Sequence, residues 1–184
     1  MKITEIVCQV LRIPSVEKKT ASSQDSVLVR VRTDNGLEGI GEADSSPEMV
    51  KAAIDAPFSH SIACGLRQVL LGENPLEQER LWQKMYRRTM YFGRTGAGIT
   101  AMAAVDMALW DLKGKIVDLP LFRLLGGKKT EVPVYASGGW TTYDDDELVD
   151  EVKGMVAQGY KMVKYKVGVE GGKNINRDVR RVAK

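Results

Sequence analysis

The sequence predicts an α+β unit over residues 1–127, followed over residues 128–184 by the first two βα units of a parallel sheet or barrel. Three observations lead to this prediction: strand patterns at the beginning of the chain, helical patterns as far as residue 127, and alternating strand and helix patterns after it. A length of 184 residues and a hydrophobic content of 43% suffice for a buried core and exclude a disordered or collagen-like chain.

Three strand patterns open the chain. Residues 2–12 are rich in Ile and Val, and residues 26–33 alternate between apolar and polar side chains. Asn35 and Gly36 separate the second run from a third at residues 37–43. Because both turn residues tolerate a positive φ, this arrangement is typical of a hairpin. The sequence therefore predicts a three-stranded antiparallel meander.

Helical patterns come after the meander. The run 74–77 (Asn-Pro-Leu-Glu) predicts a helix start with Asn74 as the N-cap, and this helix is expected to end near Thr89. A long helix is predicted over residues 99–117, because apolar side chains recur there at helical spacing. A short turn of helix is expected over residues 120–125.

Strands and helices alternate in the last third of the chain. We expect a strand at 132–137, a helix at 144–157, a second strand at 162–167 and a further helix from residue 174. The two strands begin about 30 residues apart, which matches one-eighth of a (β/α)8 barrel of roughly 250 residues. Two such units leave a parallel edge uncovered, so we expect the native protein to be about twice as long as this sequence.

Charge and composition exclude several classes of function. The segment 161–184 has eight Lys and Arg residues and two acidic ones, which give it a net charge of +6. Since the whole chain has a net charge of +3, the other residues together have a net charge of −3. This local surplus does not predict a nucleic-acid partner. No stretch reaches the roughly 18 apolar residues of a membrane span. Cys8 and Cys64 are too few for a disulfide framework, so we expect a cytoplasmic protein.

Two lysines stand out in the second strand of the βα units. Alternation along the strand places Val163, Tyr165 and Val167 on one face, and Lys164 and Lys166 on the other. Mutual repulsion and burial in a barrel interior lower the pKa of such ammonium groups, which makes a lysine a competent general base. The alternative is a solvated edge strand that carries two surface lysines.

A longer motif resembles a known family. Residues 101–115 (Ala-Met-Ala-Ala-Val-Asp-Met-Ala-Leu-Trp-Asp-Leu-Lys-Gly-Lys) and 120–126 (Pro-Leu-Phe-Arg-Leu-Leu-Gly) resemble the signature of the mandelate racemase/muconate lactonizing family of the enolase superfamily. Residues 39–43 (Gly-Ile-Gly-Glu-Ala) look like a strand of its capping domain. Residues 164–166 look like its Lys-x-Lys motif at the end of the second barrel strand. The resemblance extends over the whole chain.

The resemblance implies an N-terminal capping domain at 1–127 and the first two βα units of a (β/α)7β barrel at 128–184. It also implies a divalent metal, usually Mg²⁺, that holds a substrate carboxylate, with Lys166 as the base and Lys164 as the neighbour that lowers its pKa. The family's metal-binding carboxylates come after the third, fourth and fifth barrel strands. At about 30 residues per unit they fall beyond Lys184. We therefore expect no metal ligand in this chain, and no activity from these residues alone.

Two loops of the capping domain and one strand end are implied to contact substrate. The loops are residues 14–25, which include Ser22, and residues 44–60, which include Ser46. Ser137 lies at the end of the first barrel strand. It faces the mouth of the barrel only if the alternation of side chains along that strand places it on the inner face. The alternative for both loops is a solvated surface, and the single histidine, His60, is expected to be a surface or helix residue.

The leading hypothesis is an acid-sugar dehydratase that removes the α-proton of a small carboxylate through an enolate. A racemase or cycloisomerase of the same superfamily is the alternative within this class. A lyase that forms a Schiff base on a barrel lysine is a different enzyme class, which borohydride trapping with a keto acid would reveal. The fourth possibility is a non-catalytic fragment. Family resemblance implies a homo-oligomer, and the sequence leaves the identity of the acid open.

Overall fold

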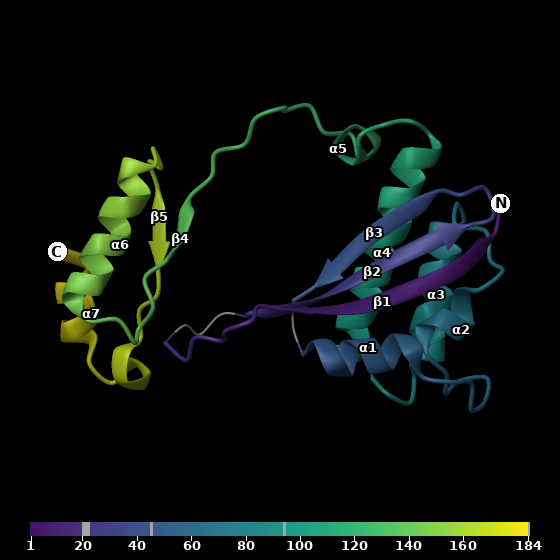
Figure 1. Cartoon of the computed structure of the whole chain (residues 1–184), viewed down its shortest axis with the longest axis horizontal. Coiled ribbons are helices and arrows are strands. Elements are labelled where there is room, and N and C mark those ends of the chain that lie inside the picture. Colours follow the sequence, from purple (N-terminus) through teal and green to yellow (C-terminus); the bar gives the residue numbers. More distant parts are fainter. Residues whose placement is uncertain (20–22, 45, 94, 184) are drawn as a thin grey trace. The chain divides into compact units, whose positions relative to one another are not determined.

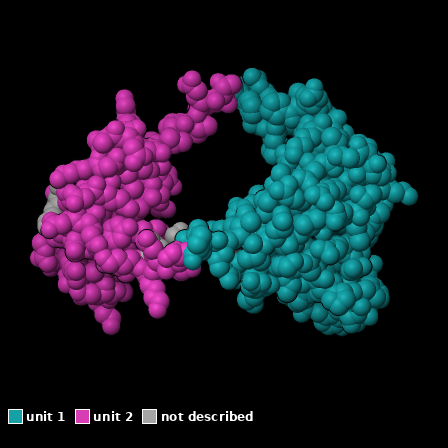
Figure 2. All heavy atoms as spheres, viewed as in Figure 1, with its two compact units in different colours: residues 1–14, 23–128 teal, residues 15–22, 129–184 magenta. Residues whose placement is uncertain are grey.

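The computed structural model describes residues 1–19, 23–44, 46–93 and 95–183 (Figure 1). The chain divides into two compact units (Figure 2). The first unit comprises Met1–Pro14 with Ser23–Lys128, and the second comprises Ser15–Ser22 with Lys129–Lys184. Among the described residues, every helix is too short or too polar to cross a lipid bilayer.

An antiparallel sheet forms one layer of the first unit. Its strands are β1 (Ile3–Arg12), β2 (Asp25–Thr33) and β3 (Glu38–Ala43), which pair in this order. In the turn between β2 and β3, Gly36 has a φ of 82°, and the Thr33 N–H donates to the Leu37 carbonyl at 3.0 Å. The predicted meander and its hairpin are confirmed.

Helices form the second layer of the first unit. They are α1 (Pro47–Asp55), α2 (Leu66–Leu70), α3 (Gln78–Arg88), α4 (Ala97–Ile116) and α5 (Leu121–Leu124). Helices α1, α2 and α4 pack against the sheet, and α3 packs on α2 and α4 (Figure 1). The long helix predicted at 99–117 is therefore confirmed as α4, and the short one at 120–125 as α5.

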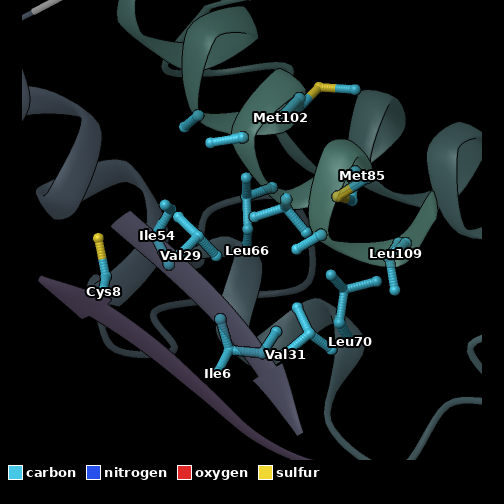
Figure 3. Close-up of a cluster of buried hydrophobic side chains, with 14 of the residues drawn as sticks. Ile6, Cys8, Val29, Val31, Ile54, Leu66, Leu70, Met85, Met102 and Leu109 are labelled. Atoms are coloured by element: carbon cyan, nitrogen blue, oxygen red, sulfur yellow. The ribbon is translucent and has the colours of Figure 1, made fainter. Parts of the chain in front are cut away.

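The core of the first unit lies between these layers (Figure 3). Val29 and Val31 of the sheet meet Met102 and Leu109 of α4 across it, and all four side chains are fully buried. Cys8 lies at its edge, where burial is the main cause that raises the pKa of its thiol from 9.0 to about 11. Both cysteines are buried and free, as expected for a chain without a disulfide framework.

The start of α3 differs from the prediction. The helix begins at Gln78, whereas residues 74–77 form a separate turn. The Asn74 Oδ1 accepts from the Leu76 N–H at 3.2 Å, and the Glu77 N–H donates to the Asn74 carbonyl at 3.2 Å. Because this short-range bond from the asparagine side chain competes with helical geometry, Asn74 closes a turn and does not cap the helix.

Strand β3 and helix α4 are in close contact at two glycines. A Cβ atom on Gly39 would lie 2.0 Å from the Ala108 carbonyl oxygen, and one on Gly41 would lie 1.9 Å from the Ala104 carbonyl oxygen. The contact is reinforced by Asp111, whose Oδ2 accepts from the Ile40 N–H of this edge strand at 2.8 Å. Glycine at these two positions of the strand is thus required by the close approach of the two backbones.

The second unit has the predicted order of strand, helix, strand and helix. Its elements are β4 (Ala136–Gly138), α6 (Asp145–Ala157), β5 (Val163–Tyr165), a 3-10 turn η1 (Val169–Gly172) and α7 (Ile175–Ala183). Strands β4 and β5 are parallel neighbours. The first helix begins with a capping box at Asp144, where the sequence predicted an acidic helix start.

Both strands of the second unit are shorter than predicted. The first was expected at 132–137 and the second at 162–167, but each has only three residues. The ladder begins where the Ala136 N–H donates to the Met162 carbonyl at 3.0 Å. Residues 132–135 pair with no other strand in the described part of the chain, and Pro133 has no N–H to offer one.

The contact between β3 and α4 leads to a prediction on stability. We expect Gly41→Ala to lower the free energy of unfolding by about 3 kcal/mol, because the added methyl group must displace helix backbone. Urea unfolding followed by circular dichroism measures the change. The matched control is Gly154→Ala in α6, where nothing lies within 4 Å of the new Cβ and a change within about 1 kcal/mol is expected. Wild-type stability of the Gly41 variant would contradict the contact.

Candidate active site

The parallel pairing of β4 with β5 brings three of the predicted site residues to neighbouring segments of the chain. The register places Ser137 opposite Lys164, and paired residues of parallel strands project to the same side. The Lys166 N–H donates to the Gly139 carbonyl at 2.9 Å, which continues the pairing past the end of both strands. Lys166 directly follows β5 and comes two residues after Lys164, the spacing at which strand residues share a face.

The opposite face of the two strands packs on α6. A Cβ atom on Gly139 would lie 2.1 Å from the Cβ of Tyr165 and 3.0 Å from a methyl group of Leu148, which belongs to α6. Val163 and Tyr165 are half-buried there, as the predicted strand phase requires. Val167 was expected on this face but is 61% exposed, because it lies beyond the end of β5.

Aromatic rings lie beside both lysines. The Lys166 Nζ is 4.6 Å from the centroid of the Trp140 ring, and the Lys164 Nζ is 5.9 Å from that of Tyr135. These are distances at which a ring face attracts a cation. Lys166 is half-buried, whereas Lys164 is exposed. The burial expected of both lysines in a barrel interior stays a prediction for the whole protein, since the described chain has only two strands of that sheet.

The peptide at Gly139 is fixed from two sides. Its N–H donates to the Glu151 Oε2 of α6 at 2.6 Å, and its carbonyl accepts from the Lys166 N–H. Glu151 also shares a hydrogen bond with the Tyr143 hydroxyl, and burial followed by the charge of Glu151 raises the pKa of Tyr143. Glu151 thus connects the helix to Gly139, whose carbonyl accepts from the Lys166 N–H.

A buried arginine holds the loop between β4 and α6. Arg181 of α7 is 4% exposed and donates to the Tyr143 carbonyl at 2.7 Å and to the Trp140 carbonyl at 3.1 Å. Its guanidinium also lies 3.7 Å from the Asp145 carboxylate. Arg181 was not among the predicted site residues, because an arginine in a basic helical segment carries no sign that it is the buried one.

The segment Ser15–Ser22, part of the first predicted substrate loop, belongs to the same unit as the two lysines. Lys19 forms an ion pair with Glu147 at the beginning of α6, and its carbonyl accepts from the Thr142 hydroxyl. The hydrogen bond between the two side chains raises the pKa of Lys19 and lowers that of Glu147. This loop therefore lies beside the loop that leads from β4 to α6. Ser22 itself is outside the described residues.

The other predicted polar residues are dispersed. Ser46 immediately precedes α1, has a φ of 47° and makes no side-chain cap hydrogen bond. It belongs to the first unit, whereas the two lysines belong to the second. Ser137 is exposed on the lysine face. His60 is exposed, with its ring centroid 5.5 Å from that of Tyr91, as expected for a surface residue.

The donor set does not fit a resident metal ion. In the part of the chain that the structure describes, no group of three or more His, Cys, Asp or Glu side chains could hold one. The acidic residues at the beginning of α6 are engaged instead in the capping box and in ion pairs with Lys19 and Arg181.

Comparison with known proteins identifies a family and several relatives. The mandelate racemase / muconate lactonizing enzyme N-terminal domain family matches residues 3–126. A D-galactonate dehydratase family member from a Marinomonas species is 38% identical over 153 residues, which cover 83% of this chain and 36% of the relative. A D-mannonate dehydratase from a Sphingomonas species has the same identity and coverage. The chain thus spans little more than a third of these relatives.

Solved structures match both units. A racemase from Streptomyces coelicolor A3(2) with bound magnesium has a TM-score of 0.82 and 31% identity, over 98% of this chain and 50% of that one. The 3,6-anhydro-D-galactonate cycloisomerase from Zobellia galactanivorans has a TM-score of 0.81 and 34% identity, over 100% of this chain and 46% of that one. The fold is therefore a capping domain followed by two βα units.

The buried arginine leads to a prediction on the loop that carries Trp140. We expect Arg181→Met to reduce the free energy of local opening of α6 by about 2 kcal/mol, because two charge-assisted hydrogen bonds are lost. Hydrogen exchange of the α6 amides measures this opening. The neighbouring Arg180 is exposed, so Arg180→Met should change the same protection by less than about 0.5 kcal/mol. Equal effects of the two substitutions would refute the role given to Arg181.

Proposed function

This chain belongs to the mandelate racemase / muconate lactonizing enzyme family, and from that premise we propose that the protein containing it removes the α-proton of a small carboxylic acid. We further propose that the substrate is an acid sugar, which then loses water. The observation that carries the proposal is the placement of Lys164 and Lys166 at the end of the parallel strand pair, with Ser137 opposite Lys164. The dehydratase names of the relatives support the loss of water.

Lys166 is the proposed base. In its neutral form a lysine amine can take up the α-proton of a carboxylic acid. The C–H bond breaks, its electron pair moves into the enolate of the carboxylate, and the proton passes to the Nζ of Lys166. The backbone hydrogen bond to Gly139 and the ring of Trp140 hold this side chain at the strand end.

Lys164 and Ser137 are the proposed substrate-binding residues. Both are exposed on the face of Lys166, where the ammonium group of Lys164 attracts the substrate carboxylate. The hydroxyl of Ser137 can donate to or accept from the hydroxyls of an acid sugar. The loop that contains Lys19 is proposed to border the substrate on the side of α6, because its ion pair with Glu147 keeps it next to the strand ends.

We also propose that the whole protein uses Mg²⁺. The support is the bound magnesium of the Streptomyces coelicolor racemase, which this chain resembles over 98% of its length. The described residues do not offer a ligand set, so we propose that carboxylates outside this sequence hold the ion. The proton transfer assigned to Lys166 uses residues of this chain alone.

Racemization or cycloisomerization is the second candidate reaction. It is favoured by the structural matches to a racemase and to a cycloisomerase. Both reactions also begin with removal of the α-proton, so they share the role of Lys166 and differ in the fate of the enolate. Products separate the two candidates: dehydration releases a keto acid, whereas the alternatives give an isomer of the same mass.

Exchange of the α-proton tests the base. In the whole protein with Mg²⁺, we expect Lys166→Ala to slow exchange of the substrate α-proton in deuterated water by about 100-fold or more, because the general base is lost. Proton NMR of the substrate monitors the exchange. Lys161 is exposed before β5, and Lys161→Ala should exchange at the wild-type rate. Wild-type exchange in the Lys166 variant would remove Lys166 from this role.

A magnesium titration tests where the ion is held. We expect calorimetric titration of this 184-residue chain with Mg²⁺ to show no saturable site in the micromolar range, since its described carboxylates do not converge. The whole protein is expected to show one. A micromolar site in the 184-residue chain would contradict the placement of the ligands outside it.

A further inference from the structure

Helix α7 holds the backbone immediately after β5. The Gly168 N–H, two residues beyond Lys166, donates to the Asp178 Oδ2 at 2.9 Å. The Val169 N–H donates to the Oδ1 of the same carboxylate at 3.2 Å. One carboxylate in the first turn of α7 therefore accepts from two consecutive amides of the loop that leads away from the strand. Asp178 has no role in the proton transfer proposed above.

The loop after β5 needs such bonds, because its backbone departs from strand geometry at once. Gly168 has a φ of 101°, and three of the four residues of η1 have φ values from 57° to 80°. This is the left-handed region, which glycine tolerates and which is unfavourable for Glu170, the one residue of the three that has a side chain. Within the described residues, the pairing of β5 with β4 goes no further than the Lys166 N–H. Beyond it, the loop has the Asp178 carboxylate in place of a neighbouring strand.

The same helix also binds the loop after β4. Arg181 follows Asp178 by three residues, a spacing that places two side chains on one side of a helix. Arg181 donates to the carbonyls of Trp140 and Tyr143, and the ring of Trp140 lies beside the Lys166 Nζ. One side of α7 thus holds two segments that meet at the Lys166 side chain. They are the backbone that follows Lys166 and the backbone that carries the ring beside it.

We propose that Asp178 is a positioning residue for Lys166. Its carboxylate fixes the backbone at Gly168, and this keeps the Lys166 Nζ over the Trp140 ring at the end of β5. Asp178 acts through the loop and does not touch the substrate. Because a base must lie close to the proton that it removes, a displacement of about 1 Å can slow the transfer up to about 100-fold. The effect on the reaction rests on the function proposed above, whereas the placement of the side chain can be measured without substrate.

NMR of the 184-residue chain tests the placement. The ring current of Trp140 should shift the ε-methylene protons of Lys166 upfield, because the end of this side chain lies over the ring. We expect Asp178→Asn to reduce this upfield shift by about half, since the amide keeps one acceptor oxygen but loses the second one and the charge. Asp178→Ala leaves both loop amides without their acceptor and should remove most of the shift.

Glu170→Gln is the matched control. It makes the same charge change in the same loop, but the ion pair of Glu170 with Arg177 is exposed, with 53% and 43% of the two side chains accessible. Because such a surface pair contributes little, the Lys166 protons should keep their wild-type shift. Thermal unfolding gives the temperature below which each variant is folded, and Asp178→Asn decides the test if Asp178→Ala does not fold. A wild-type shift in Asp178→Asn, or an equal loss in Glu170→Gln, would overturn the proposal.

Exchange of the α-proton in the whole protein with Mg²⁺ tests the consequence. We expect Asp178→Asn to slow exchange at saturating substrate by about tenfold and to change KM by less than about twofold, because the base is displaced while the substrate-binding side chains remain. A merely structural role would lower the unfolding temperature and leave this rate constant unchanged. Slow exchange in Lys166→Ala together with wild-type exchange in Asp178→Asn would contradict the positioning role. Wild-type exchange in Lys166→Ala would instead refute the proposed function, and the NMR result would still decide the placement.

Discussion

The close approach of strand β3 to helix α4 is the constraint on which the first unit depends. Gly39 and Gly41 leave no room for a side chain, and the helix meets them with Ala104 and Ala108. This contact fixes the position of α4, whose Met102 and Leu109 form the core with the sheet valines (Figure 3). The segment 101–115 is therefore largely a packing motif, and Asp111 within it accepts a hydrogen bond from the edge strand.

In the second unit, hydrogen bonds to the backbone hold the ends of two short strands. The backbone at Gly139, just after β4, bonds to Glu151 and to the Lys166 N–H. Arg181 donates to the Trp140 carbonyl in the loop between β4 and α6. These bonds hold the strand ends although each strand has only three residues. Each of these bonds runs from a helix or a neighbouring strand to the backbone beside the two lysines. The helices of a βα unit thus set the geometry of a strand end, where barrel enzymes carry their chemistry.

Most of the fold was predictable from local patterns, because turn chemistry and apolar periodicity act over a few residues. The Asn35-Gly36 hairpin and helix α4 are examples, as is the parallel pairing of the strands that carry Ser137 and Lys164. The predictions that were wrong or missing concern residues whose structure depends on competing hydrogen bonds or on partners distant in the sequence. Asn74 closes a turn that competes with helix capping, and the residues before β4 have no strand to pair with in the described chain. Arg181 is buried by loop carbonyls about 40 residues away in sequence, which no local pattern reveals.

The central claim is that Lys166, held at the end of β5, reaches the acidic carbon of a bound carboxylate. A crystal structure of the whole protein with an unreactive substrate analogue tests this most directly. We predict that the Lys166 Nζ lies about 3–3.5 Å from the carbon that bears the α-proton, with Lys164 at the carboxylate. A Lys166 side chain turned away from that carbon, with another basic group in its place, would contradict it.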